Sequence, residues 1–463
     1  MRRERIHAGK GINHRGVSQT MELDQKISSQ TAEICVIGLG YVGLPLAVSL
    51  AEVGFSVTGL DIARDRVAAI GRGQSYIGDI ASKSLAAQVR AGRLRATLDY
   101  DALNSIDIIF ICVQTPFHVT KDPDLSHVVA ASRGIAERLH PRQMVILQST
   151  TYPGTTEEVV LPILESSGLR GGQDFHLAFS PERIDPGNPK WTVDNTPKVV
   201  GGLTPACAAL AEALLRQLTP EVCVVSTPRA AEMAKLLENT FRSVNIALVN
   251  ELALLCERMG MDIWEVIQAA STKPFGFMPF RPGPGVGGHC IPVDPRYLSW
   301  KAREYDFHTK FIELAAEVNE EMPLHVAQLV SKGLNLHGKP VRGSRVLVLG
   351  VSFKPNIDDA RNSPAEPIIE LLLQGGAEVQ YHDPYVPRFD VGESTRLHQH
   401  YAMTSVALTE ESIRMSDVVV IAAAHSDIDY GWVAQHAKLV IDTVNATAGS
   451  TSGGRIVRLG APA

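Results

Sequence analysis

The fold is decided by residues 33–61, whose sequence is EICVIGLGYVGLPLAVSLAEVGFSVTGLD. Ile34–Ile37 and Phe55–Leu60 are short apolar runs, and Leu44–Val53 between them has helical periodicity. A glycine-rich segment, residues 38–43, separates the first apolar run from the helix. This order predicts a strand, a glycine turn, a helix and a second strand.

The turn carries three glycines in the pattern G-x-G-x-x-G: Gly38, Gly40 and Gly43. Gly38 permits a tight turn, Gly40 lets the backbone approach a pyrophosphate at the helix N-terminus, and Gly43 permits close helix–strand packing. Asp61 lies about 20 residues further on, where a carboxylate accepts from a ribose 2′-OH. The pattern predicts a dinucleotide site. Asp61 favours NAD because a 2′-phosphate would meet its negative charge, and Arg64 is a mild opposing signal.

Alternating strands and helices continue through two further parts of the chain, which predicts doubly wound parallel sheets. In the first part the expected strands are Asp107–Val113, Met144–Gln148, His176–Phe179, Lys198–Val200 and Val222–Val225. In the second part, which starts near Gly343, we expect strands Arg345–Leu349, Glu378–Tyr381, Asp417–Ile421 and Lys438–Ile441 and a helix Pro364–Leu373.

A different pattern separates these two parts. Arg229–Met259 contains no Gly or Pro and should form one long helix that ends at Gly260. Ile263–Ala270 and Phe311–Leu329 are further expected helices. Apolar side chains recur at helical spacing along the long helix at Met233, Leu236, Leu237, Phe241, Val244, Leu248 and Leu252. Such a helix can connect two domains, and it can also form the contact surface of a dimer.

We therefore expect an α/β protein with two Rossmann-like sheet domains joined by a long central helix. The expected boundaries are a flexible tail at 1–30, an NAD-binding domain at 31–227, a central helical domain at 228–335 and a C-terminal α/β domain at 336–463. The tail is polar and lacks the apolar core of a secretory signal.

The composition limits the function classes. The 463 residues are 45% hydrophobic and 20% charged with a formal net charge of -6, which argues against a nucleic-acid or lipid-surface role. No apolar run reaches the roughly 18 residues of a membrane helix. The six cysteines form no C-x-x-C pair, so no disulfide framework or metal site is expected, and a cytoplasmic location fits best.

Lys273–Asp294 is the most unusual segment, because it is too rich in Gly and Pro for a helix or strand. Its glycines at 283, 285, 287 and 288 are expected to leave bare amides that can cradle phosphate or sugar. Cys290 closes the loop and Asp294 follows it, which favours a nucleophilic thiol over a buried structural one. His289 is discounted as its partner, because adjacent side chains on extended backbone point in opposite directions.

These residues resemble the UDP-glucose/GDP-mannose dehydrogenase family over nearly all of Glu33–Ala448. The matching pieces, in chain order, are Gly38–Gly43, Val113–Pro116, Gln148–Thr150, Ser180–Arg183, Ala231–Lys235 with Asn239, Gly287–Asp294 and Phe353–Lys354. Phe277–Phe280 and Gly288–Pro292 are most similar to the UDP-N-acetylglucosamine 6-dehydrogenases of that family. The resemblance implies a UDP-sugar substrate, a nucleotide-sugar (UDP)-binding role for the C-terminal domain at 336–463, a homodimer or higher homo-oligomer, and a place in polysaccharide biosynthesis.

The resemblance also implies a four-electron oxidation of the C6 alcohol to an acid, with two NAD+ per substrate. Cys290 captures the aldehyde as a thiohemiacetal, which becomes a thioester that water hydrolyses. Lys235 and Asn239 are four residues apart on one helix face and can donate to the developing oxyanion.

Two further roles concern the proton and the water. Asp294 is the candidate base, directly or through water, and Thr115 and Glu182 can order that water. The implied NAD contacts are Gly38, Gly40, Tyr41, Val42, Gly43, Asp61, Arg66, Thr115 and Thr150. The implied substrate contacts are Glu182, Arg183, Lys235, Asn239, Arg281, Gly287, Gly288 and Lys354, with Lys354 on the diphosphate.

One position departs from the family pattern. The family places an arginine in an Asp-Thr-Arg-Asn stretch, whereas this chain has Val444 between Thr443 and Asn445. One substrate contact is therefore in doubt, and Arg281 or Arg361 are candidates to replace it.

Several alternatives remain open. UDP-N-acetylmannosamine, UDP-N-acetylgalactosamine and UDP-glucose are other candidate substrates. A two-electron hydroxyacid-type dehydrogenase shares the same plan but needs no thiol, so Cys290 discriminates against it. A nucleotide-binding regulator without turnover is opposed by the presence of Lys235, Asn239, Cys290 and Asp294 together.

Overall fold

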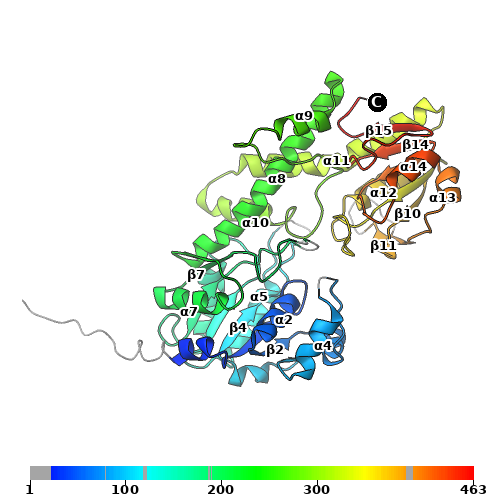
Figure 1. Cartoon of the computed structure of the whole chain (residues 1–463). Helices are drawn as coiled ribbons and strands as arrows, with labels where there is room; N and C mark the ends of the chain where they lie inside the picture. Colours follow the sequence, from blue (N-terminus) through cyan, green and yellow to red (C-terminus); the bar gives the residue numbers. More distant parts are fainter. Residues whose placement is uncertain are drawn as a thin grey trace, which may run out of the picture. The chain divides into compact units, whose positions relative to one another are not determined.

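The computed structural model describes residues 22–78, 80–117, 122–185, 188, 190–392 and 400–462. The chain divides into two compact units, Met1–Lys235 and Leu236–Ala463. Both units have the α/β architecture with predominantly parallel sheets that the sequence predicted (Figure 1).

The first unit is built on an eight-stranded sheet of order β3-β2-β1-β4-β5-β6-β7-β8. Its paired strands are parallel, except that β6 and β7 run antiparallel. The strands are β1 Glu33–Ile37, β2 Ser56–Leu60, β3 Leu94–Thr97, β4 Ile108–Ile111, β5 Met144–Leu147, β6 His176–Phe179, β7 Lys198–Gly202 and β8 Val222–Val225. The connecting helical elements are α2 Gly43–Val53, α3 Arg64–Gly71, α4 Ser82–Arg90, η1 Tyr100–Ser105, α5 Ser126–Ala136, η2 Thr156–Val160, α6 Leu161–Glu165 and α7 Pro205–Leu215.

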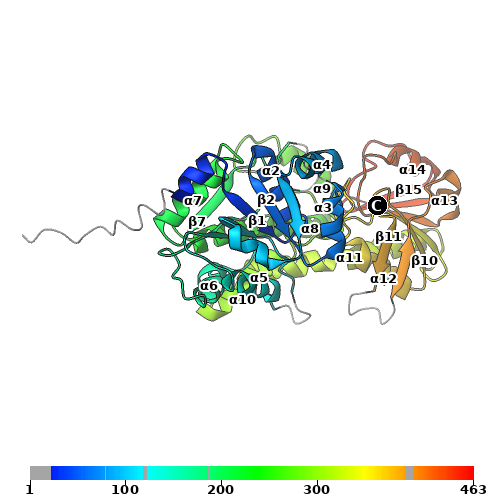
Figure 2. The ribbon, with the colours of Figure 1, turned by 90° about the horizontal axis from the view of Figure 1, so that it is seen from below.

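Helices cover both faces of this sheet. Because side chains alternate along a strand, Ile34 and Val36 of β1 pack in one cluster with α2, α4 and α7. Cys35 and Ile37 of the same strand pack on the other face with α5 and α6. Figure 2 shows α2 and α4 on one side of β1 and β2 and α5 and α6 on the other. A sheet buried on both faces explains why its strands are continuous apolar runs.

The expectation of a flexible tail up to residue 30 is wrong in its last part. Residues 22–28 form a helix, and Leu23 and Ile27 are buried in the core of the first unit. These two side chains are four residues apart and share one helix face, a pair too short to stand out among polar neighbours. Residues 1–21 of the predicted tail lie outside the described residues.

The long helix is present as predicted. α8 spans Pro228–Met259, and Gly260 follows it with a left-handed φ of 71° that ends the helix. It begins in the first unit and continues into the second, where α9 Ile263–Ala270, α10 Asp294–Ala302, η3 Arg303–Tyr305 and α11 Lys310–Leu336 follow. α11 extends beyond its expected end at Leu329, and it contains Pro323.

The second unit carries a five-stranded parallel sheet of order β10-β9-β13-β14-β15. The strands are β9 Arg345–Leu349, β10 Glu378–His382, β13 Val418–Ile421, β14 Leu439–Asp442 and β15 Arg455–Arg458, and β11 Arg388–Val391 and β12 Tyr401–Thr404 form an antiparallel pair. The remaining helices are α12 Ala365–Gln374, α13 Glu410–Met415 and α14 Tyr430–His436. α11 and α12 cover one face of this sheet, and α13 and α14 cover the other.

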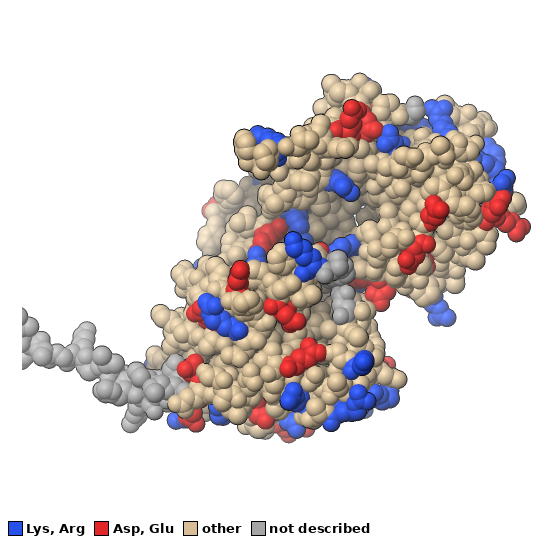
Figure 3. Space-filling model, in the orientation of Figure 1, with Lys and Arg blue, Asp and Glu red and all other residues tan. Residues whose placement is uncertain are grey.

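The surface agrees with the modest net charge. Figure 3 shows basic and acidic side chains interspersed over the visible face, without an extended field of one sign. Among the described residues, no helix combines the length and the apolar character that crossing a membrane requires.

Candidate active site

The glycine turn after β1 has the close approaches that the motif predicts. Gly38 has a φ of 90°, and a methyl group there would lie 2.5 Å from the carbonyl oxygen of Cys112. A methyl group on Gly43 would lie 1.8 Å from the Gly38 carbonyl oxygen, so the start of α2 can approach the turn only without a side chain. By contrast, a methyl group on Gly40 would meet no atom within 4 Å. The open space above Gly40 is where a diphosphate would approach the N-terminus of α2, so these residues fit a dinucleotide.

Asp61 lies directly after β2 and is buried against this turn. Its Oδ2 accepts a hydrogen bond from the Leu39 amide and its Oδ1 accepts one from the Ala63 amide, both at 2.8 Å. Arg66 Nη1 lies 3.3 Å from Oδ2. The carboxylate therefore both fixes the turn and presents a negative charge at the end of β2, where a ribose would be recognised.

Four more of the predicted NAD contacts lie at strand ends of the first unit or at the start of α2. Tyr41 and Val42 are half-buried at the N-terminus of α2. Thr115 Oγ1 donates to the Thr150 carbonyl oxygen at 2.8 Å, which joins the segments after β4 and β5. Carboxyl ends of adjacent parallel strands are the usual ligand-binding edge of such a sheet.

Glu182 is buried and ionised. Its Oε2 accepts from Gln148 Nε2 at 2.7 Å and from Lys198 Nζ at 3.2 Å, and its Oε1 accepts from the amides of Arg183 and Ile184. Burial alone would raise the pKa of Glu182, but the Lys198 ammonium and the two amides outweigh it, so its pKa lies below the usual value. A group held as the carboxylate in this way orders neighbouring donors and does not serve as an acid.

Lys198 is bound to Glu182 in this network, and the sequence did not indicate that it would be part of the site. It begins the apolar strand β7 and is fully buried, although a lysine at a strand end is ordinarily exposed. Arg183, a predicted substrate contact, donates from Nη1 to the Pro197 carbonyl oxygen at 2.7 Å.

The first turns of α8 are anchored by a buried carboxylate. Glu232 accepts hydrogen bonds from the amides of Gly154 and Thr156 and from the Thr156 hydroxyl. Burial raises the pKa of Glu232 despite these donors. Lys235, one turn further along, is buried as well, so it is not the solvent-exposed lysine typical of a helix.

In the second unit, α8 and α10 bring two predicted catalytic residues together. Asn239 is fully buried, and its Nδ2 donates to Oδ2 of Asp294, the first residue of α10. Arg242 donates to the Asn239 Oδ1 and thereby fixes the orientation of the amide. The Asp294 amide donates to the Cys290 carbonyl oxygen at 2.7 Å, so Cys290 lies one helical turn before Asp294.

Cys290 differs from most of the other cysteines in exposure. Cys35, Cys112, Cys207 and Cys256 are buried, Cys223 is exposed and Cys290 is half-buried. Burial raises the pKa of the Cys35 thiol to about 12 and also raises that of Cys112. These strand thiols are therefore unreactive, as expected for structural cysteines.

The argument that excluded His289 as a partner of Cys290 is wrong. The backbone is bent and not extended at residues 288–290, and His289 Nδ1 lies 3.7 Å from the Cys290 sulfur. The His289 imidazole thus lies beside the thiol.

The expectation of bare amides in the glycine-rich loop is also wrong at two positions. The Gly283 amide donates to Asn250 Oδ1 at 2.9 Å, and the Gly288 amide donates to the Arg361 carbonyl oxygen at 3.0 Å. A methyl group on Gly287 would lie 2.6 Å from the Phe353 Cβ. Gly287 and Gly288 serve close packing of the loop against Phe353, and the amides at 283 and 288 are not available to an anion.

The remaining predicted substrate residues lie around β9 and β14 or on the loop. Lys354 is half-buried after β9, and Arg281 is exposed. Arg361 binds the Asp359 carboxylate through Nε and Nη2, so its guanidinium is engaged. Val444 is partly buried and packs against an apolar cluster. It therefore leaves no charge at the position where the family that this chain resembles has an arginine.

A dinucleotide turn in one unit and a cysteine loop beside an Asn–Asp pair in the other define a class of protein. They are typical of nicotinamide-dependent oxidoreductases.

Comparison with known proteins identifies the family. The chain matches the three models of the UDP-glucose/GDP-mannose dehydrogenase family: the NAD binding domain at residues 32–219, the central domain at 229–321 and the UDP binding domain at 347–449. The UDP-N-acetyl-D-glucosamine 6-dehydrogenase of Pseudomonas aeruginosa is 39% identical over 85% of this chain and 91% of its own length. The UDP-N-acetyl-D-mannosamine dehydrogenase of Pyrococcus horikoshii is also 39% identical, over 76% of this chain and 84% of its own.

A solved structure gives the same result. The UDP-D-ManNAc dehydrogenase structure from Pyrococcus horikoshii aligns with a TM-score of 0.83 and 33% identity, covering 92% of this chain and 99% of that one. The chain belongs to the UDP-glucose/GDP-mannose dehydrogenase family. It is therefore an NAD-dependent oxidoreductase of nucleotide sugars.

Proposed function

We propose that the chain oxidises the C6 alcohol of a UDP-N-acetylhexosamine to the uronic acid, with UDP-N-acetylglucosamine as the first candidate. The observation that carries the proposal is the position of Cys290: half-buried, one helical turn before Asp294, which is held by the buried Asn239. A two-electron dehydrogenase has no use for such a thiol.

The chain's own groups account for the intermediate steps. NAD+, held at the glycine turn after β1 and by Asp61, would supply the hydride acceptor for each of the two oxidations. Between these events the Cys290 thiolate attacks the aldehyde carbon, and Asn239 and Lys235 donate to the oxyanion that forms. Asp294, directly or through water, takes the proton of the Cys290 thiol. His289 is a second candidate acceptor of this proton, because its Nδ1 lies 3.7 Å from the sulfur.

Hydrolysis completes the reaction. Water attacks the thioester carbon, the carbon–sulfur bond breaks, and the carboxylate leaves while Cys290 regains its proton. We assign Glu182, which is ionised and buried, and Thr115 to ordering the water. The overall balance is one alcohol, two NAD+ and one water giving one carboxylate, two NADH and three protons.

The hexosamine epimer is the second question. UDP-N-acetylmannosamine is the alternative, because a relative named for it is as similar, at 39% identity, as the relative named for UDP-N-acetylglucosamine. UDP-N-acetylgalactosamine and UDP-glucose are the other two candidate substrates to be tested.

We also propose that the protein is a homodimer formed through α8. Met233, Leu237, Phe241, Leu248, Leu252, Leu255 and Met259 recur at helical spacing and are exposed. A continuous apolar stripe of this length is typical of a surface that a second copy covers.

The test is the yield of NADH with a limiting amount of each sugar nucleotide. Two NADH and one uronic acid per substrate consumed are expected, with the highest kcat/KM for UDP-N-acetylglucosamine. One NADH per substrate, with free aldehyde accumulating, would reject the thiol mechanism. A higher kcat/KM with the mannosamine epimer would move the assignment to that substrate.

A further inference from the structure

The two sheets repeat one local arrangement. In the first unit, the amide of Leu39, after β1, donates to Asp61, after β2, at 2.8 Å. In the second, the amide of Val351, after β9, donates to Asp383, after β10, at 2.7 Å. Gly350 precedes Val351 with a φ of 80°, as a glycine with positive φ precedes Leu39. Asp383 thus occupies the position that recognises a ribose in the first sheet.

Asp383 is nevertheless saturated by the protein itself. Its Oδ2 accepts from the amides of Val351 and Ser352 and lies 3.0 Å from His425 Nε2, and its Oδ1 accepts from the amides of Tyr385 and Val386. Burial would raise the pKa of Asp383, but the His425 hydrogen bond and the amides hold it below the usual value. A carboxylate with five donors has no capacity left for a ribose hydroxyl, so it has a different task.

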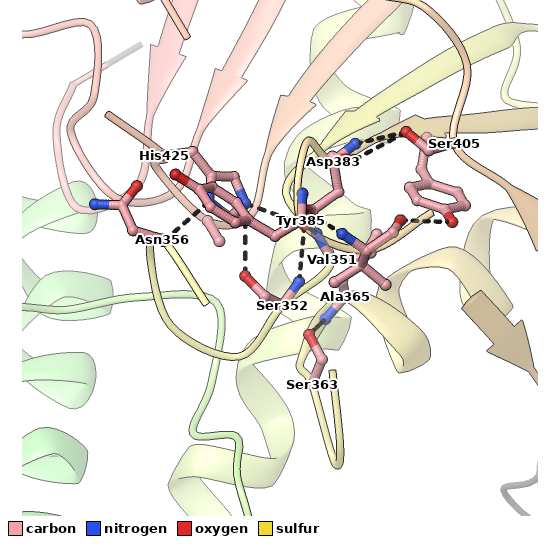
Figure 4. A network of polar contacts seen from close by, with 12 residues as sticks. Val351, Ser352, Asn356, Ser363, Ala365, Asp383, Tyr385, Ser405 and His425 are labelled. Atoms are coloured by element: carbon pink, nitrogen blue, oxygen red, sulfur yellow. Dashed lines mark hydrogen bonds and ion pairs between the residues drawn. The ribbon is translucent and has the colours of Figure 1, made fainter. Parts of the chain in front are cut away.

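The tautomer of His425 follows from its two neighbours. The Asn356 amide donates to His425 Nδ1 at 3.0 Å, so Nδ1 carries no proton. Nε2 is then the protonated nitrogen and donates to Asp383. Figure 4 shows the imidazole between Asn356 and Asp383, with the Tyr385 ring beside it, and both side chains of the His–Asp pair are fully buried.

The segment that His425 holds contains Lys354. Asn356 has a left-handed φ of 63°, and its Oδ1 accepts from the amide and hydroxyl of Ser426. Ser352 Oγ donates to the Lys354 carbonyl oxygen at 2.8 Å. The backbone on both sides of Lys354 is therefore fixed by contacts that converge on His425 and its neighbour Ser426.

The segment that contains Lys354 and Asn356 is also hydrogen-bonded to the loop that carries Cys290. Gly288 donates its amide to the Arg361 carbonyl oxygen at 3.0 Å and accepts at its own oxygen from Asn362 Nδ2 at 3.1 Å. The Phe353 amide donates to the Asp359 carbonyl oxygen at 3.0 Å, which ties the two ends of the loop together. Gly288 is two residues from Cys290, so one loop, residues 352–362, carries both Lys354 and the support of the thiol.

We infer that His425 is a positioning residue: as the neutral Nε2–H tautomer, braced by Asp383, it holds the 352–362 loop so that Lys354 meets the substrate diphosphate and Cys290 meets the sugar. The proposed effect of His425 on both groups passes through this loop. The inference rests on the proposed roles of Lys354 and Cys290, and it adds that nucleotide binding and thiol placement depend on one buried histidine.

Two substitutions separate the functions of the ring nitrogens. In His425→Asn, the side-chain oxygen can take the place of Nδ1 and accept from Asn356, while Asp383 keeps four donors. In His425→Gln, the longer amide can reach Asp383 but no longer accepts from Asn356. His382→Gln is the matched control, because this half-buried histidine of β10 contacts a different backbone group, the Val406 carbonyl oxygen.

Two readouts apply to the full-length enzyme. His425→Gln should raise the KM for the UDP-sugar about tenfold, the equivalent of one lost hydrogen bond, while the KM for NAD+ stays unchanged. It should also speed the alkylation of Cys290 by iodoacetamide, measured on the Cys290 peptide by mass spectrometry, with exposed Cys223 as reference. His425→Asn and His382→Gln should stay within about twofold of wild type in both readouts, since the Asn356 hydrogen bond persists.

Asn356→Ala loosens the loop from its other side while leaving His425 intact, so it should give the same pair of changes even if His425→Gln does not fold. Wild-type KM and alkylation rate in His425→Gln, or equal impairment in His425→Asn and His425→Gln, would overturn the inference. The alkylation comparison requires no turnover, so it is independent of whether the proposed reaction is correct.

Discussion

At the scale of single residues, the exposure of Cys290 and its neighbours leads to a specific expectation. Cys290→Ser keeps a hydroxyl near the substrate but removes the readily ionised, polarisable thiolate. The first hydride transfer does not need sulfur, whereas the second needs the thiohemiacetal. We expect overall turnover to fall roughly 10³-fold or more, as for other covalent nucleophiles, with cofactor and substrate still bound.

Steady-state NADH formation and binding of both ligands by calorimetry measure these effects. Cys256→Ser is the control, because that cysteine is buried on α8 and should alter stability at most. Wild-type turnover in Cys290→Ser would show that Cys290 is not the nucleophile, and the two-electron mechanism would then lead.

Asp61 should determine the choice of nicotinamide cofactor. Its buried negative charge repels a 2′-phosphate, so kcat/KM should be about 100-fold higher for NAD+ than for NADP+. Asp61→Asn keeps the size and one acceptor oxygen but leaves Arg66 without its ion-pair partner. The preference should then fall about tenfold or more.

Kinetics with both cofactors check this expectation. Asp65→Asn, an exposed acid in the first turn of α3, should leave the ratio unchanged. Comparable efficiency with NADP+ in the wild type would mean that Arg64 or Arg66 already overrides Asp61.

The limits of prediction at this scale have physical causes. Glycine spacing indicated the turn at Gly38–Gly43, because close approach requires glycine wherever it occurs. The Gly288 amide was misjudged, since its acceptor is the carbonyl oxygen of Arg361, more than seventy residues away in the sequence. Lys198 and His425 were missed for the same reason: their partners come from other strands, and no local pattern marks them.

At the scale of elements, α8 makes a testable surface. Leu237 and Leu248 lie on the same side of the helix, and their side chains are 60% and 52% exposed. Covering one such leucine stabilises a complex by about 1.5–3 kcal/mol, so a charged residue there should separate the copies. The wild type should sediment at about twice the 50.1 kDa chain mass, and Leu248→Glu should shift it towards one chain.

Leu336→Glu provides the comparison, because this equally exposed leucine lies at the end of α11 and outside the stripe. A wild-type protein that sediments as a single chain, or a Leu248→Glu variant that remains paired, would contradict the assignment of this surface.

Elements with strong periodicity were predicted closely, and weakly patterned ones were not. β9 and α9 have the expected bounds, and α8 begins one residue early. β3 and β15 were missed, since each is a four-residue edge strand that mixes charged and apolar residues, LRAT and RIVR. α11 continues past its expected end because packing of Val330 and Leu334 on the second sheet outweighs the local signal.

At the scale of the whole molecule, strand–helix alternation was sufficient for the architecture, because buried parallel sheets require apolar strands and covering helices. The sequence did not reveal that both sheets reuse one arrangement of glycine, amide and carboxylate. In the first sheet there is open space above Gly40, whereas in the second the carboxylate of the arrangement is bound by His425. The same backbone geometry thus serves ligand binding in one place and loop support in the other.

The burial of four cysteines has a consequence for how the protein ages in air. Peroxide attacks accessible thiolates, so Cys35, Cys112, Cys207 and Cys256 are shielded from the oxidant while Cys223 and Cys290 remain exposed to it. The role proposed for Cys290 therefore predicts that oxidation abolishes activity while the chain is still folded. The first oxidation product, a sulfenic acid, can be reversed by a thiol reductant, whereas the later ones cannot. Activity and folded protein should then be lost at separate rates on storage. Oxidation of the Cys290 sulfur is expected to set the faster of the two rates.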